Sequence, residues 1–72
     1  MGTDTIGCNA GLIWRLLNEH RQKMSYEDLV NASGITEREL CMAIGWLARE
    51  NKIIISTQGG IMYFEVYHEC YY

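Results

Sequence analysis

The strongest constraint on the fold is a helix-starting device that occurs twice between residues 25 and 53. Ser25 and Thr36 are N-cap residues, and each is followed three positions later by an acidic residue, Asp28 or Glu39. The acidic side chain can accept a hydrogen bond from the backbone N–H of the cap, which completes a capping box. Gly34 lies between the two starts, where the helix that begins after Ser25 must end in a left-handed conformation. Two capped helices joined by such a short turn predict a helix-turn-helix.

Changes in hydrophobic periodicity place the remaining elements. From Lys52 onward, two β-rich runs flank the pair Gly59 and Gly60, which predicts a hairpin. The expected elements are helices at 5–21, 26–33 and 37–50, a short strand within 22–24, and hairpin strands at 53–55 and 61–67, with an ambiguous tail at 68–72. The fold class is therefore α+β: a winged helix-turn-helix with three helices, a short strand and a C-terminal β-hairpin wing. One domain is expected to cover residues 1–72.

The core is expected where apolar residues recur every three or four positions in the helices and at the start of the hairpin. A hydrophobic staple between Met24 and Leu29 is expected at the start of the second helix. A second staple, Ile35 with Leu40, is expected at the start of the third. The residues predicted to be buried are Ile13, Leu17, Leu29, Leu40, Ile44, Leu47, Ile53 and Ile55.

The composition indicates a small soluble domain. The chain has 72 residues, of which 49% are hydrophobic, and a formal net charge of −3. A domain of this size buries only about 60% of its unfolded surface, so oligomerisation is a common way to cover the excess. Cys8, Cys41 and Cys70 are odd in number and far apart, which indicates free thiols in a reducing compartment. Arg15 interrupts the apolar run after Gly11, and no basic segment precedes that run. We therefore expect a cytoplasmic protein without a signal peptide or membrane span.

Two segments resemble a small bacterial winged helix-turn-helix family of unknown function, known mainly from the Bacteroides group. The matching residues are IGCNAGLIWRLL at 6–17 and LCMAIGWLARENKI at 40–53, and the run GWLARE at 45–50 is the most specific part. Cys8 stands where the family usually has Glu. The resemblance implies a winged-helix fold and carries no established activity or catalytic residues.

Gly11 and Gly45 lie inside expected helices, where glycine costs about 1 kcal/mol relative to alanine. Each lies near a tryptophan in the sequence, Trp14 or Trp46. One hypothesis is that the first and third helices approach closely at these glycines, with the indoles filling the space beside them. The alternative is that the glycines are tolerated without a packing role.

DNA binding is the first function that a helix-turn-helix suggests, and the expected contacts are Thr36, Arg38, Arg49 and Lys52. Only Arg38 lies near the N-terminal end of the third helix, where base edges are normally read. The helix-turn-helix at residues 25–51 carries two bases and five acids, a net charge of 2 − 5 = −3. The predicted wing loop has no Lys or Arg. Any DNA affinity is therefore expected to be weak, because phosphate neutralisation supplies much of it.

Protein–protein interaction is the rival function. The first helix has apolar residues around more than half its circumference, which is more than one small core requires. Met and aromatic residues are enriched in interface cores, and the third helix adds two of them on its outer side. A homodimer is expected, with the first helix contributing much of the interface, and a protein partner is the alternative. The predicted interface residues are Leu12, Trp14, Leu16, Met42 and Trp46.

Catalytic patterns are not found in the sequence. It has no glycine-rich phosphate loop, nucleophile elbow or paired-carboxylate site. His68 and Cys70 would share one side of a strand, but their spacing with His20 or Cys41 matches no zinc pattern. We therefore expect no enzymatic activity, metal, cofactor or small-molecule substrate.

Overall fold

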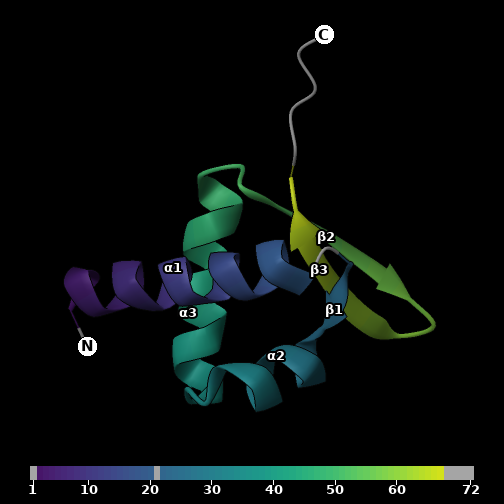
Figure 1. The fold of residues 1–72 in the computed structure, drawn as a ribbon, viewed down its shortest axis with the longest axis horizontal. Helices are drawn as coiled ribbons and strands as arrows, with labels where there is room; N and C mark the ends of the chain where they lie inside the picture. Colours follow the sequence, from purple (N-terminus) through teal and green to yellow (C-terminus); the bar gives the residue numbers. More distant parts are fainter. Residues whose placement is uncertain (1, 21, 68–72) are drawn as a thin grey trace, which may run out of the picture.

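The helices and strands follow one another in the predicted order (Figure 1). The computed structural model describes residues 2–20 and 22–67. Its elements are α1 (Thr3–His20), β1 (Met24–Ser25), α2 (Tyr26–Ser33), α3 (Glu37–Arg49), β2 (Ile53–Gln58) and β3 (Ile61–Val66). The predicted winged helix-turn-helix is confirmed, with α2 and α3 as the helix-turn-helix and the β2–β3 hairpin as the wing.

Both predicted capping boxes are formed. The Ser25 Oγ accepts a hydrogen bond from the Asp28 N–H at 3.1 Å, and the Asp28 carboxylate accepts one from the Ser25 N–H at 3.2 Å. At the start of α3, the Thr36 Oγ1 accepts from the Glu39 N–H at 3.1 Å, and the Glu39 carboxylate accepts from the Thr36 N–H at 3.0 Å. Gly34 ends α2 with a φ of +71°, which glycine adopts without steric cost. These local bonds explain why both helices begin where the sequence predicts.

The helix ends differ slightly from the prediction. The first helix begins two residues earlier than expected. Residue 21, which the prediction included in it, and the tail at 68–72 lie outside the described residues. Glu50 is the C-cap of α3 rather than its last residue. Asn51 follows with a φ of +57°, a left-handed conformation that asparagine adopts more readily than most residues.

The strands form one antiparallel sheet in the order β1-β3-β2. β1 pairs with the central strand β3 over two residues only. Gly59 and Gly60 have φ values of +60° and +79°, as a two-residue type I′ hairpin turn requires. β2 pairs with β3 over its full length, from Ile53 opposite Val66 to Gln58 opposite Ile61. In the described part of the chain, β2 therefore forms a free edge of the sheet.

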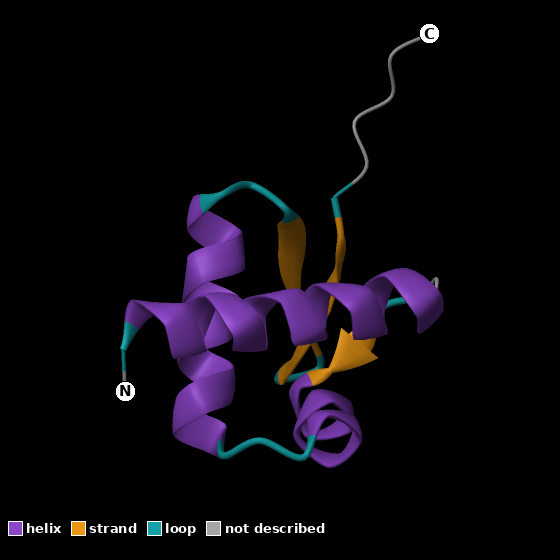
Figure 2. Ribbon diagram, turned by 60° about the vertical axis from the view of Figure 1, so that its left-hand side comes forward, coloured by secondary structure: helices purple, strands orange, loops and turns teal. Residues whose placement is uncertain are grey.

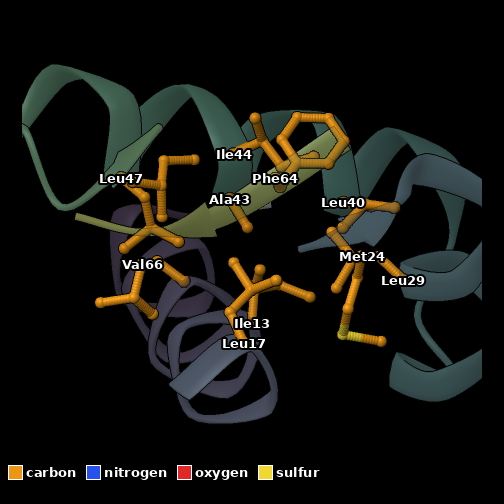
Figure 3. Packing of buried hydrophobic residues seen from close by; sticks show 12 residues of the cluster. Ile13, Leu17, Met24, Leu29, Leu40, Ala43, Ile44, Leu47, Phe64 and Val66 are labelled. Carbon is orange, nitrogen blue, oxygen red and sulfur yellow. The ribbon is translucent and has the colours of Figure 1, made fainter. Parts of the chain in front are cut away.

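The hydrophobic core lies between the helices and one face of the sheet. Figure 2 shows α1 crossing α3, with the strands behind α1. Directly opposite residues in an antiparallel pair share a face, so Ile53 and Val66 face the helices together. In Figure 3, Ile13 and Leu17 of α1 project toward the side chains from α3 and the sheet. The buried core comprises Ala10, Ile13, Leu17, Met24, Leu29, Leu40, Ala43, Ile44, Leu47, Ile53, Phe64 and Val66.

Every residue predicted to lie in the core is buried except Ile55. Ile55 is 41% exposed, so its assignment to the core is wrong. Its side chain lies on the helix-facing side of the sheet, as predicted, because it is opposite the buried Phe64. It nevertheless belongs to the edge strand, which has β3 as its single neighbour among the described strands. Phe64, on the central strand, belongs to the core.

Candidate nucleic-acid interface

An exposed row of residues lies along α3 on the side away from the core. Its members are spaced four, three and four residues apart, which places them on one helix face. We call this row the α3 stripe: Arg38, Met42, Gly45 and Arg49. At 1.5 Å per residue, the two arginines lie about 16 Å apart along the helix axis. The structure therefore brings two of the predicted nucleic-acid contacts, Arg38 and Arg49, onto one face.

Thr36 lies at the N-terminal end of α3, but the cap already uses its hydroxyl. The Thr36 Oγ1 accepts from the Glu39 N–H and donates to the Glu39 Oε1, both at 3.1 Å. The hydrogen bonds from the Thr36 backbone and side chain hold the pKa of Glu39 below its usual value. Thr36 therefore positions the first turn of α3 and keeps a negative charge there.

Lys52 is held at the start of the wing by its backbone. Its N–H donates to the Leu47 carbonyl at 3.0 Å, and its carbonyl accepts from the Tyr67 N–H at 2.9 Å. Lys52 lines a hollow together with Trp14 and Trp46. The structure thus brings Lys52 to the two tryptophans, rather than to the N-terminal end of α3.

This hollow tests the hypothesis about the helix glycines. It has a volume of about 210 Å³, and Gly11 and both tryptophans contribute to its lining. A Cβ atom placed on Gly11 or Gly45 would meet no atom within 4 Å outside its immediate surroundings in the helix. The idea that α1 and α3 approach closely at these glycines is therefore wrong. The helices meet through their buried faces, and both glycines are exposed beside that contact.

Lys23 places a positive charge beside the wing. The sequence alone does not reveal this placement. Its Nζ donates to the Gln58 Oε1 at 2.8 Å and lies 4.9 Å from the centre of the Tyr63 ring, a cation–π contact. The short pairing of β1 with β3 carries Lys23 to this position. Such pairing between distant segments leaves no local sequence signal. The wing loop, which has no Lys or Arg of its own, is therefore flanked by one lysine.

A small polar cluster connects α2 to α3. The Tyr26 hydroxyl donates to the Glu37 Oε1 at 3.2 Å and lies 3.6 Å from the Cys41 Sγ. The hydrogen bond with Cys41 contributes most to raising the pKa of the Tyr26 phenol, followed by burial. Glu37 raises this pKa further. The phenol therefore stays neutral and links the two helices.

Metal-binding geometry is absent from the part of the chain that the structure describes. Within residues 2–20 and 22–67, no three His, Cys, Asp or Glu side chains come together around a possible ion. His68 and Cys70, which were considered for a metal from the sequence, lie outside these ranges. Among the described helices, none combines the length and apolar character needed to cross a membrane.

The predicted interface residues differ in exposure. Leu12, Trp14 and Leu16 on α1 are half-buried, and the latter two pack against the core. Met42 and Trp46 on α3 are 42% and 40% exposed. The other large exposed apolar side chains of residues 2–20 and 22–67 lie on or beside the hairpin: Ile54, Ile55, Ile61, Met62 and Tyr67. The most exposed apolar surface is therefore on α3 and the hairpin rather than on α1.

The helix-turn-helix, the antiparallel wing and the exposed stripe on α3 define a winged helix-turn-helix domain. Residues 1–66 match the family described as Winged helix-turn-helix domain (DUF2582). The chain belongs to this family, in agreement with the resemblance seen in the sequence.

Proteins from an archaeon and a bacterium are similar to this chain. The uncharacterized protein MJ1608 of Methanocaldococcus jannaschii is 41% identical over 51 residues, which cover 69% of this chain and 73% of that protein. The solution NMR structure of BT2368 from Bacteroides thetaiotaomicron has a TM-score of 0.79 and 33% identity, covering 92% of this chain and 79% of that one. A structure concerning the DNA recognition and protein interaction domains of HOP2 has a TM-score of 0.69 and 27% identity. That match covers 81% of this chain and 97% of the other.

Proposed function

We propose that this protein is a cytoplasmic DNA-binding module of the transcription-regulator type, which acts as a homodimer and catalyses no reaction. The α3 stripe is the observation that carries the proposal. It is exposed, has an arginine at each end and contains no acidic residue. The similarity to a HOP2 structure that concerns DNA recognition supports the proposal by analogy of fold.

The stripe has dimensions that suit a major groove. That groove is about 12 Å wide, and the two arginines are about 16 Å apart along the helix. Each guanidinium can therefore reach the phosphates on one side, while the middle of α3 lies in the groove. Gly45 occupies this middle position, and its missing side chain lets the helix backbone approach the bases. Met42 beside it offers an apolar contact of the kind that suits a thymine methyl group.

Acidic residues around the stripe limit the affinity. Glu37 and Glu39 flank Arg38 in the sequence, and residues 25–51 carry a net charge of −3. Two arginines and one flanking lysine neutralise few phosphates, so little counterion release drives binding. The dissociation constant for mixed-sequence duplex DNA should therefore be micromolar or weaker near physiological salt.

Fluorescence anisotropy with a labelled mixed-sequence duplex, measured over a range of salt concentrations, tests this function. Arg38→Ala and Arg49→Ala should each weaken binding to all sequences and reduce the slope of log affinity against log salt by about 1. Arg15→Ala is the matched control, because it removes an arginine that is also exposed but lies on α1. It should leave both quantities nearly unchanged. Nanomolar, sequence-selective binding that survives Arg38→Ala would contradict the proposed site.

A protein-interaction module is the second candidate function. The exposed apolar side chains of α3 and the hairpin favour it, since contiguous apolar surface commonly marks an interface. Lack of any DNA binding at low salt, where phosphate contacts are strongest, would favour this candidate over the first.

A further inference from the structure

We infer that two copies of this chain associate edge to edge through β2, so that their sheets join across a two-fold axis. This inference rests on the homodimer proposed above and specifies where the copies meet. It does not depend on DNA binding.

The β2 strand has an unused row of backbone hydrogen-bonding groups. The Lys52 carbonyl accepts from the Tyr67 N–H at 2.9 Å, so the Lys52 carbonyl points toward β3. Successive residues of an antiparallel strand alternate in the side to which their backbone groups point. The groups of Ile53, Ile55 and Thr57 therefore point away from β3, toward the free edge. Among the described residues, no backbone hydrogen bond reaches them.

This edge lacks the features that normally prevent strands from pairing between molecules. Monomeric proteins protect their edge strands with charged side chains, proline or a β-bulge. β2 has the sequence IIISTQ, with no charge and no proline. Its pairing with β3 continues without interruption from Ile53 to Gln58, so it contains no bulge. Closed pairing with a second copy would remove this open template for aggregation.

The outward groups of β2 are complementary to themselves when the two-fold axis passes at Ile55. Antiparallel pairing then places Ile55 opposite Ile55 of the partner subunit, and Ile53 opposite Thr57 of the partner subunit. Each outward N–H meets an outward carbonyl, giving about six hydrogen bonds across the axis. An axis at Ile54 would place Thr57 opposite Asn51 of the partner subunit, a residue with a φ of +57° outside the strand. The register centred on Ile55 therefore satisfies the most backbone groups.

The same register covers apolar side chains that the single chain leaves exposed. Ile55, which is 41% exposed, would lie against its own counterpart on the helix-facing side of the sheet. Ile54, also 41% exposed, would lie beside Ser56 of the partner subunit on the opposite side. Lys52 would lie opposite Gln58 of the partner subunit. A second copy thus fits this edge in hydrogen bonding and apolar contact.

Amide hydrogen exchange combined with sedimentation tests the inference on the unmodified chain. Sedimentation on the order of tens of micromolar should show about twice the chain mass. The N–H groups of Ile53, Ile55 and Thr57 should become protected as protein concentration rises, because association pairs them. The N–H groups of Ile54 and Ser56 should show much less change, since they already face β3.

Three variants sharpen this test. Ile55→Pro removes an outward N–H without removing a bond to β3, and should give a folded monomer. Met62→Ala is the matched control, because it removes a 45% exposed apolar side chain from β3 and leaves the β2 edge intact. This variant should remain dimeric. Leu12→Glu changes the rival surface on α1 and should also remain dimeric.

A monomer at this concentration would overturn both the inference and the proposed homodimer. A dimer in which the Ile55 N–H exchanges freely, or which Leu12→Glu dissociates, would overturn the β2 interface and leave the homodimer standing. Assemblies larger than a dimer would contradict the closed two-fold pairing. Loss of DNA binding alone would count against the DNA function only, and the exchange pattern at β2 would still decide the interface.

Discussion

Ile55 lies directly opposite Phe64 in the β2–β3 ladder, yet Phe64 is 1% exposed and Ile55 is 41% exposed. The two side chains share one face of the sheet and differ in their neighbours. Phe64 belongs to the central strand, which has β1 and β2 beside it, whereas Ile55 belongs to the free edge. Burial in this sheet therefore depends on the position of the strand as well as on the alternation of side chains along it.

Replacing Leu47 tests the core directly. Leu47 is 3% exposed on the inner face of α3. Leu47→Ala should lower the free energy of unfolding by about 2 to 5 kcal/mol, measured by urea denaturation, because it removes buried methyl groups and leaves a cavity. Met42→Ala on the exposed face of the same helix is the control, with an expected change within about 0.5 kcal/mol. A Leu47→Ala change that small would mean that this face of α3 is not packed.

Replacing either helix glycine, Gly11 or Gly45, with alanine should increase the stability of the protein. A Cβ atom on Gly11 or Gly45 would meet no atom within 4 Å beyond its immediate helical surroundings, and neither has a positive φ. Gly11→Ala and Gly45→Ala should therefore each raise the free energy of unfolding by about 1 kcal/mol, through helix propensity alone.

Gly60→Ala is the contrasting variant, because the φ of +79° at this turn position is unfavourable for alanine. Thermal or urea denaturation should show a loss of stability for this variant and a gain for the two helix variants. A loss of stability in Gly11→Ala would mean that the hollow beside α1 is filled in solution.

The folded protein should lose stability in acid because of the Thr36–Glu39 cap of α3. The Thr36 hydrogen bonds hold the pKa of Glu39 below its value in the unfolded chain, which is about 4.3. The unfolded state therefore binds the proton more tightly in this range. The stabilising contribution of Glu39 is fully present above its unfolded pKa, and it is lost as the pH falls through the folded pKa.

Thr36→Ala should lower stability by about 0.5 to 2 kcal/mol near neutral pH and return the Glu39 pKa toward its ordinary value. NMR titration of the Glu39 carboxyl carbon in both proteins measures the shift. Titration of Glu39 at an ordinary value in the unmodified protein would contradict the cap geometry.

The helix-turn-helix could be predicted because its signals are local. Ser25 with Asp28, and Thr36 with Glu39, depend only on residues three positions apart, and both boxes form as expected. The inner faces of α1 and α3 were likewise predictable from helical spacing, because each apolar period points to one side.

The exposed Ile55 and the placement of Lys23 could not be predicted in this way. The exposure of Ile55 depends on the strand order β1-β3-β2, which local periodicity does not encode. Lys23 reaches Gln58 only because β1 pairs with β3 from a distant part of the chain. The many apolar residues of α1 led us to expect more exposed apolar surface on this helix than the structure has. Trp14 and Leu16 also pack against the core, which the helical spacing does not reveal.

NMR titration of ¹⁵N-labelled protein with a mixed-sequence duplex at low salt tests DNA binding through the α3 stripe most directly. We expect the amide shifts to concentrate at Arg38, Met42, Gly45 and Arg49, and to shrink as salt is added, because phosphate contacts drive the binding. The amide of Arg15 on α1 should not shift. Salt-sensitive shifts confined to the stripe would support the proposed site. Shifts absent from α3, or centred on α1, would contradict it.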